Sequence, residues 1–186
     1  MIGYAICGSF CTLKDSLAQL EALSREGHEI QPIMSEITTS VSTRFFDKDV
    51  LIRKIREITG RQIINTVKDS EPLGAASPLS AMIIAPCTGN TLAKLATGVT
   101  DSAVTMAAKA HLRNDRPLLI ALASNDALSR NLKNIATLLQ RKSVYFVPLR
   151  QDDPEKKPHS LVADFTRLRE AYLAMQRGKQ LRPLFV

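Results

Sequence analysis

Short apolar segments alternate with amphipathic segments along the whole of this 186-residue chain. The apolar segments have the length of strands covered on both faces, and the segments between them repeat apolar positions every three or four residues, as helices do. This alternation favours an α/β fold with a doubly wound parallel sheet, in which helices cover both faces as a three-layer Rossmann-like sandwich. Residues 1–186 are expected to form one domain, since the chain is too short to divide comfortably between two cores.

The pattern predicts where the elements lie. Strands are expected at residues 2–7, 30–34, 81–85, 118–123 and 144–148, with an edge strand at 62–67 and Pro86 closing the third. Helices are expected at residues 13–25, 50–58, 90–96, 101–112 and 129–140, the last with Leu132, Ile135, Ala136 and Leu139 on one face. A C-terminal helix over 160–177 and a short tail complete the chain, and residues 68–80, with two prolines and a glycine, form a loop.

Composition excludes several classes of protein. The mean hydropathy is −0.04, and no apolar run approaches the roughly 18 residues of a membrane-spanning helix. Residues 1–6 run directly into a strand without the basic leader of a secreted protein. The three cysteines are an odd number that cannot form a complete disulfide framework. We therefore expect a cytoplasmic protein that does not enter the membrane.

The net charge of +7 is unevenly distributed. Residues 1–93 carry nine basic and ten acidic side chains, whereas residues 94–186 carry sixteen and eight. Nucleic acid is not the expected partner, because aromatic residues make up only 5% of the chain and are not interleaved with the basic ones. The excess suits an anionic small molecule or an acidic partner protein.

Small polar residues follow four of the predicted strands, at 8–10, 34–36, 86–91 and 123–126. Parallel strands of such a sheet end at one edge, where ligands bind, and backbone N–H groups and helix N-termini there favour phosphate. Each loop taken alone fits an ordinary helix cap equally well. Four together favour a nucleotide-like ligand.

The sequence also narrows the class of nucleotide that can bind. The first loop has only Gly8 where a dinucleotide-binding loop has three spaced glycines, and no phosphate loop ending in Gly-Lys-Ser or Gly-Lys-Thr occurs. A mononucleotide such as FMN remains. Its expected binding residues are Gly8, Ser9, Phe10, Ser35, Thr38, Pro86, Cys87, Thr88, Asn90, Thr91, Ala123, Ser124 and Asn125.

One segment resembles a known family. Residues 86–96, Pro-Cys-Thr-Gly-Asn-Thr-Leu-Ala-Lys-Leu-Ala, with Gly98 and Asp101-Ser102, resemble the signature loop of the flavin-dependent cysteine decarboxylases and flavin prenyltransferases. Most of the chain then resembles one branch of that superfamily, the flavoprotein components of bacterial dipicolinate synthases. The specific stretches of this second likeness are Gln-Asp-Asp-Pro at 151–154 and Lys-Pro at 157–158, supported by residues 122–126 and 160–164.

This resemblance implies a flavodoxin-like fold, assembly into trimers or multiples of them, and FMN bound between protomers. It also implies a separate partner, the nicotinamide-dependent component of dipicolinate synthase, which uses NADP. The two together would oxidise a dihydrodipicolinate-type precursor to pyridine-2,6-dicarboxylate during sporulation. The helices after Asn90 and Asp101 are expected at the interface between protomers, through Ala93, Ala96, Ala103, Ala107 and Ala108. The chain departs from the decarboxylases in one respect, because residues 68–80 lack their catalytic histidine.

The remaining candidates are weaker, and no catalytic residue or metal site is assigned. Cys87 precedes a helix, where a thiol pKa can fall, but buried structural cysteine is more common. Cys7 and Cys11 lack a second pair of zinc ligands. A dicarboxylate substrate needs cations, for which Lys157 is the first candidate and Arg150 the next, with Arg130 weaker. The residues with a structural or solvent-exposed role as the default are His28, His111, His159, Asp152 and Asp153.

Three functions therefore stay open. The chain is an FMN-binding component of an oxidoreductase, a decarboxylase or prenyl-transferring relative, or a non-catalytic component that binds a phosphate-bearing ligand or holds the nicotinamide-dependent partner.

Overall fold

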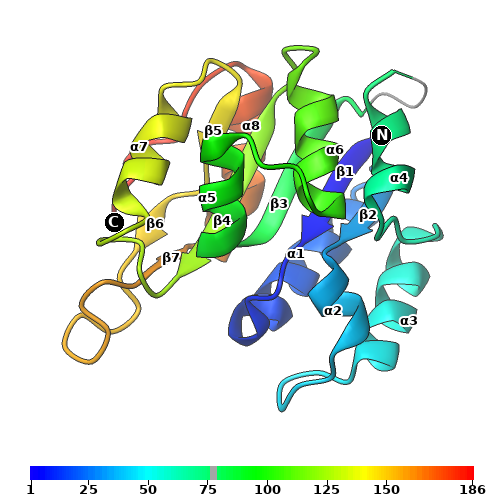
Figure 1. The fold of residues 1–186 in the computed structure, drawn as a ribbon, viewed down its shortest axis with the longest axis horizontal. Coiled ribbons are helices and arrows are strands. Elements are labelled where there is room, and N and C mark those ends of the chain that lie inside the picture. The colour runs from blue at the N-terminus through cyan, green and yellow to red at the C-terminus, as the bar shows by residue number, and fades with distance from the viewer. Residues whose placement is uncertain (76–78) are drawn as a thin grey trace.

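Four parallel strands form the centre of the fold (Figure 1). The computed structural model describes residues 1–75 and 79–186. The strands are β1 (Ile2–Ile6), β2 (Ile30–Met34), β3 (Ala81–Thr88) and β4 (Leu118–Ser124), and they lie in the order β2-β1-β3-β4 within a seven-stranded sheet. Every residue of β1 and β4 is buried, which confirms the expected doubly wound sheet covered on both faces.

The far half of the sheet is mixed. The parallel strand β5 (Val144–Phe146) pairs with the first half of β4, and β7 (Leu161–Ala163) pairs antiparallel with its end. The edge strand β6 (Leu149–Arg150) pairs antiparallel with β7. The sheet order therefore ends β4-β7-β6.

The predicted C-terminal helix over 160–177 is wrong at its start. Residues 161–163 form β7, a short 3-10 turn follows at Phe165–Arg167, and α8 begins only at Leu168 and ends at Gln176. The burial pattern explains the error, because Leu161 and Ala163 are buried while Val162 between them is not. This two-residue period belongs to a strand and is too short to stand out beside the helix that follows.

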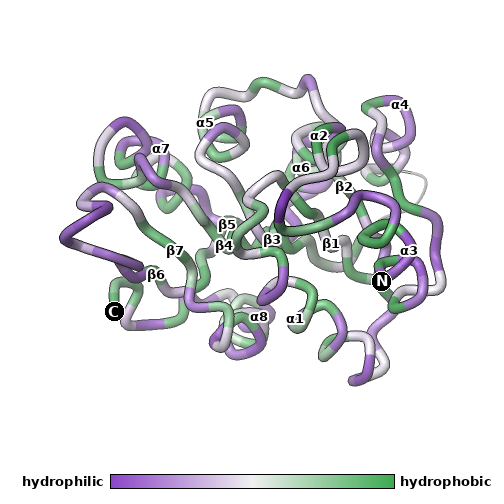
Figure 2. Tube along the Cα trace, turned by 90° about the horizontal axis from the view of Figure 1, so that it is seen from below, coloured by the Kyte–Doolittle hydropathy of each residue, from purple (hydrophilic) through white to green (hydrophobic). Residues whose placement is uncertain are grey.

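Helices cover both faces of the sheet (Figure 2). On one face lie α1 (Leu13–Arg25), preceded by a 3-10 turn at Phe10–Thr12, and α8. On the other lie α5 (Gly89–Thr97), α6 (Ala103–Leu112) and α7 (Leu132–Leu139). The helix α3 (Lys48–Thr59) packs beside β2, and α2 (Glu36–Ser40) connects them. Among the described residues, no helix combines the length and apolar character needed to cross a membrane.

Two expectations before the signature loop are corrected. The edge strand at 62–67 is reduced to one bridge between Ile33 and Ile64, because Thr66 caps a short helix, α4 (Val67–Ser70), and accepts a hydrogen bond from the Asp69 N–H. The expected loop 68–80 contains the end of α4 and a 3-10 turn at Glu71–Leu73, and its residues 76–78 lie outside the described residues.

The strand β3 continues past Pro86, which does not close it. Its pairing register with β4 shifts between Ile84 and Cys87, after which Cys87 pairs with Leu122 and Thr88 with Ala123. A bulge tolerates a residue that has no N–H to donate, so the proline sits where the ladder is already interrupted. The signature loop thus begins inside the sheet.

The buried side of α7 differs from the predicted one. Leu132 is 46% exposed and Ala136 is exposed, whereas Asn134, Ile135 and Leu138 are buried. The helix is turned so that Asn134 can donate a hydrogen bond to Asn131, and a polar network therefore takes part of the space that the apolar pattern assigns to leucine.

The core also holds the alanines of α6. Ala103, Ala107 and Ala108 have no exposed surface, while Ala93 and Ala96 of α5 are half-buried. The α6 alanines allow that helix to pack closely on the sheet of its own protomer, so their predicted place in an interface between protomers is wrong.

Candidate functional site

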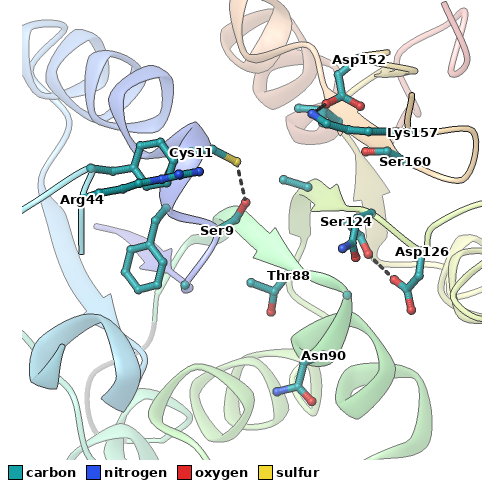
Figure 3. Close-up of a pocket in the computed structure, with 17 residues that line it drawn as sticks. Ser9, Cys11, Arg44, Thr88, Asn90, Ser124, Asp126, Asp152, Lys157 and Ser160 are labelled. Carbon is teal, nitrogen blue, oxygen red and sulfur yellow. Dashed lines mark hydrogen bonds and ion pairs between the residues drawn. The ribbon is translucent and has the colours of Figure 1, made fainter. Parts of the chain in front are cut away.

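Two adjoining cavities lie at the carboxyl ends of the parallel strands. The main cavity measures about 640 Å³ and is bordered by the ends of β1, β3 and β4 (Figure 3). The side cavity measures about 540 Å³ and lies toward α2 and the start of α6. Gly8, Thr88 and Asn90 line both. This is the edge of a doubly wound sheet at which ligands bind.

The strand-end residues predicted to bind the ligand fall into three groups. The main cavity is lined by Gly8, Ser9, Phe10, Thr88, Asn90, Ala123, Ser124 and Asn125. The side cavity is lined by Ser35 and Thr91, together with the shared residues. Neither cavity is lined by Thr38, Pro86 or Cys87. The sheet edge thus brings most of the predicted positions around two adjoining cavities.

The three predicted residues outside the cavity walls have structural surroundings. Thr38 is fully buried and donates a hydrogen bond to the Ser35 carbonyl at 2.6 Å, which shapes the first turn of α2. Pro86 is buried within β3. Cys87 is buried too, and loss of water, with Cys7 nearby, raises the pKa of its thiol well above the ordinary value. A protonated, enclosed thiol is not a nucleophile.

A polar network supports the start of α5. Asp126 accepts hydrogen bonds from the Ser124 hydroxyl at 2.5 Å and from the Asn131 amide at 2.8 Å. These bonds, the one from Ser124 first, hold the pKa of Asp126 below its usual value. A Cβ on Gly89 would collide with the Ser124 oxygen and lie 2.8 Å from that of Asp126, so only glycine fits here.

The same helix start carries an ordinary cap. The Thr88 hydroxyl accepts a hydrogen bond from the Thr91 N–H at 3.2 Å, so this side chain has the capping role that each strand-end loop allows. Thr91 in turn donates to the buried thiol of Cys7 at 3.4 Å. Burial raises the pKa of Cys7 to about 11. Capping and cavity lining therefore coincide at Thr88.

The two predicted substrate cations are separated by the fold. Lys157 lines the main cavity, where its ammonium group pairs with Asp152 at 2.7 Å. This pair raises the pKa of Lys157 and lowers that of Asp152. Arg150 is exposed on β6 and lines neither cavity. The fold therefore places Lys157, and not Arg150, at the wall of the main cavity.

Sequence reasoning missed the residues that complete the main cavity. Arg44 and Phe45 come from the loop between α2 and α3, and Cys11 comes from the 3-10 turn after β1. Attention to strand ends could not find Arg44 or Phe45, because their loop joins two helices. The available signal was the pair of adjacent phenylalanines at 45–46 in a polar loop, of which Phe45 is 46% exposed.

The three histidines are not among the residues that line either cavity. His28 packs edge-on against the ring of Tyr172, with centroids 5.5 Å apart. His111 is buried and donates from Nε2 to the Pro117 carbonyl at 2.9 Å, and burial lowers its pKa. His159 is exposed. No group of three or more His, Cys, Asp or Glu side chains within residues 1–75 and 79–186 is arranged to hold a metal ion.

Comparisons with known proteins agree with this architecture. The Flavoprotein family matches residues 1–167. The B subunit of dipicolinate synthase from Bacillus subtilis is 41% identical over 185 residues, which covers 100% of this chain and 92% of that protein. The crystal structure of the dipicolinate synthase B subunit from Bacillus halodurans superposes with a TM-score of 0.91 at 39% identity, over 100% of this chain and 95% of that one.

A more distant likeness shows how widely the fold is used. The dodecameric FMN-dependent UbiX-like decarboxylase of Escherichia coli O157:H7 matches with a TM-score of 0.61 and 21% identity, over 80% of each chain. These findings confirm the flavodoxin-like fold. The chain belongs to the Flavoprotein family and, within it, is a homologue of the B subunit of dipicolinate synthase.

Proposed function

We propose that this chain is the FMN-binding component of a dipicolinate synthase. With an NADP-dependent partner protein, the A subunit of the enzyme, it oxidises a dihydrodipicolinate-type precursor to pyridine-2,6-dicarboxylate during sporulation. The observation that carries the proposal is the convergence of four separate strand-end loops on one cavity system, which suits a mononucleotide. The homologues are named as one subunit of a synthase, which supports a two-component enzyme.

The residues around the two cavities fit FMN. Hydroxyl groups of Ser9, Ser35 and Thr88 suit a phosphate and a polyol chain, and Phe10 supplies apolar surface for a flat ring. Together the cavities are as large as ligand sites of this class require. When bound, FMN supplies the capacity to accept two electrons from a ring whose aromatisation favours the reaction.

The protein's own residues would bind and orient the cofactor and the substrate. Thr88 and Asn90 would hold the cofactor where β3 passes into α5, and the main cavity offers a dicarboxylate the cations Arg44 and Lys157, the second of which is paired with Asp152. Burial of carboxylates without cationic partners costs on the order of several kcal/mol, so a dicarboxylate needs cations at its site. Decarboxylation is disfavoured, because the histidine expected for it is missing from residues 68–80 and Cys87 is buried.

Binding of FMN tests the proposal directly. Fluorescence titration of the purified chain should show saturable binding, and Ser9→Ala and Asn90→Ala should each weaken it while the unfolding midpoint stays unchanged. Ser80→Ala, at an exposed serine outside both cavities whose hydroxyl donates to the Met1 carbonyl, is the matched control. Unchanged FMN affinity in both cavity variants would contradict the assignment of the loops.

Activity separates the oxidoreductase component from a non-catalytic scaffold. This chain alone, the NADP-dependent partner alone and the two together should be assayed for dipicolinate formation with and without FMN. The proposal expects activity from the pair, with dependence on FMN. A colourless protein that is indifferent to FMN but increases the activity of the partner would instead support the scaffold function.

A further inference from the structure

The loop between α2 and α3 forms one rim of the main cavity. Arg44 and Phe45 line the cavity from this side, and Asp152 and Lys157 line it from the loop between β6 and β7. Figure 3 shows Arg44 on the side of Ser9 and Cys11, with the Lys157 pair across the opening. A ligand that reaches beyond the strand-end loops therefore passes between Arg44 and Lys157.

Hydrogen bonds fix the shape of this loop. The Thr43 N–H donates to the Phe46 carbonyl at 2.9 Å, and the Phe45 N–H donates to the Thr43 hydroxyl at 3.2 Å. Asp47 ends the loop as the cap of α3 and accepts from two backbone N–H groups. Phe46 packs against the core. With Phe46 as its inward anchor, the loop directs its two neighbours, Arg44 and Phe45, to the cavity.

The two cations of the main cavity differ in whether they form an ion pair. Its lining contains two cations, Arg44 and Lys157, and two carboxylates, Asp126 and Asp152. Lys157 is paired with Asp152 at 2.7 Å, whereas no carboxylate in the described part of the chain lies within ion-pair distance of Arg44. Arg44 is thus the cavity's uncompensated cation.

The side chain of Arg44 is also oriented by its neighbour. The guanidinium carbon lies 4.8 Å from the centre of the Phe45 ring. A guanidinium that stacks by its face keeps the N–H groups in its plane free, and those groups match the two oxygens of a carboxylate. The ammonium group of a lysine has neither a flat face nor two parallel N–H donors. Stacking on Phe45 therefore prepares Arg44 for a carboxylate.

We propose that Arg44 determines substrate specificity by binding a carboxylate of a flat anionic substrate in the main cavity. This inference rests on the proposed function and names the residue that recognises the substrate class. The Lys157–Asp152 pair contributes little net charge and borders the opposite side. The 2,6-disposed carboxylates of a pyridine ring suit such a site, with one held by Arg44.

Calorimetric titration of the purified full-length chain with pyridine-2,6-dicarboxylate tests the assignment, with and without FMN. Arg44→Gln should weaken binding at least tenfold, and Arg44→Lys should recover only part of the loss. Affinity for pyridine-2,6-dimethanol, the uncharged analogue, should stay within twofold. Arg150→Gln, which removes an exposed arginine outside both cavities, should leave the dicarboxylate affinity unchanged.

The outcomes are distinct. Unchanged dicarboxylate affinity in Arg44→Gln, an equal loss for the uncharged analogue, or no dicarboxylate binding by the wild-type chain with or without FMN would each overturn the role of Arg44. Failure of the wild-type chain to bind FMN would overturn the proposed cofactor, while titration of the FMN-free chain would still decide the carboxylate question. Circular dichroism of each variant should match the wild type, because Arg44 is exposed.

Discussion

At the scale of single residues, Gly89 is the most constrained position of the site. It begins α5 and leaves room for the side chains of Ser124, Asp126 and Asn131, which bond to one another. Gly89→Ala should destabilise the protein by about 1–3 kcal/mol, because the added methyl group must displace this network. Urea unfolding measures the loss, and Gly98→Ala is a useful comparison, since its Cβ would meet no atom within 4 Å although its φ is +77°.

The comparison distinguishes two causes of destabilisation. Gly98→Ala reports backbone strain alone and should leave FMN affinity unchanged. Gly89→Ala should in addition weaken FMN binding, because the displaced Ser124 lines the main cavity. If Gly89→Ala bound FMN normally, the network would be a support of the fold with no part in the site.

The ion pair between Lys157 and Asp152 leads to a second residue-scale prediction. Asp152→Asn should strengthen binding of pyridine-2,6-dicarboxylate, because it removes the partner that neutralises Lys157 in the cavity. Lys157→Ala should weaken binding by leaving Asp152 unpaired beside the ligand. Titration of both variants at low and at moderate salt measures the effect. The two variants should change the dicarboxylate affinity in opposite directions. A weaker affinity in both would mean that the pair matters only for the shape of its loop.

His111 should make stability depend on pH. Burial lowers its folded-state pKa below the usual 6.5, so as the pH falls below about 6.5 the unfolded chain takes up a proton that the folded chain does not. Stability is therefore highest above pH 6.5 and declines toward the depressed pKa. His111→Gln should reduce this decline in urea unfolding measured at pH 7.5, 6.5 and 5.5. An identical slope in the variant would assign the pH dependence to other groups.

At the scale of elements, charge follows the direction of the helices. Many basic residues of the second half lie at or just after helix C-termini, such as Lys109 and Arg113 at α6, Arg141 after α7, and Arg177 after α8. Cations are favourable there because they face the negative end of the helix dipole. Helix ends therefore account for part of the basic excess that suggests an anionic ligand, and among the described residues Arg44 and Lys157 are the cations that line the main cavity.

The elements also show which patterns are readable in a sequence. The central strands and α1, α3, α5 and α6 follow from long apolar or amphipathic runs, and the structure confirms them. The strands β6 and β7 have two and three residues, which is too short for an alternation of buried and exposed residues to be recognised in the sequence. β6 pairs with β7, and β7 pairs with β4, which is more than thirty residues away from β7 in the chain. Long-range pairing of this kind leaves little local signal.

One side chain replaces a strand neighbour at the end of β5. The amide of Gln180 accepts from the Phe146 N–H at 2.8 Å and donates to the Phe146 carbonyl at 2.7 Å. Gln180→Ala should reduce the free energy of unfolding by about 1–3 kcal/mol, because it leaves a backbone donor and acceptor of a buried residue unpaired. Urea denaturation checks this, with the exposed neighbour Lys179→Ala as the control. Equal stability of the two variants would mean that water replaces the amide without loss.

At the scale of the whole molecule, the parallel sheet determines how much of the site can be predicted. Residues that follow separate strands are brought to one edge by topology, so the strand-end loops at 8–10, 34–36, 86–91 and 123–126 could be assigned to one ligand site from their positions alone, and most of their residues line the two adjoining cavities. The loop containing Arg44 and the pairing of Lys157 with Asp152 depend on tertiary contacts that no period in the sequence describes.

Self-association is the prediction that belongs to the complete fold. The α6 alanines are in the core and cannot form the contact surface, whereas the half-buried Ala93 and Ala96 of α5 stay available to it. Ile37 and Val41 are 50% and 42% exposed, lie four residues apart at α2, and border the side cavity through Ile37. Val41 lies just past the end of α2 in extended backbone, and its N–H donates to the Ile37 carbonyl at 3.2 Å, so the two exposed apolar side chains belong to one short apolar face. A second copy that covers this face would bury it and enclose the ligand site, as the family resemblance implies for FMN.

We therefore expect a trimer or a multiple of it in light scattering at micromolar concentration, and not a 20.5 kDa particle. Val41→Asp should shift the mass toward the monomer, because burying a carboxylate between copies without a cationic partner costs on the order of several kcal/mol. It should also weaken FMN binding if the copies share the site. Leu173→Asp, at a position 39% exposed on α8 in the opposite helix layer, should leave both unchanged. A monomer in the wild type would exclude self-association, and an oligomer disrupted only by Leu173→Asp would place the contact on α8.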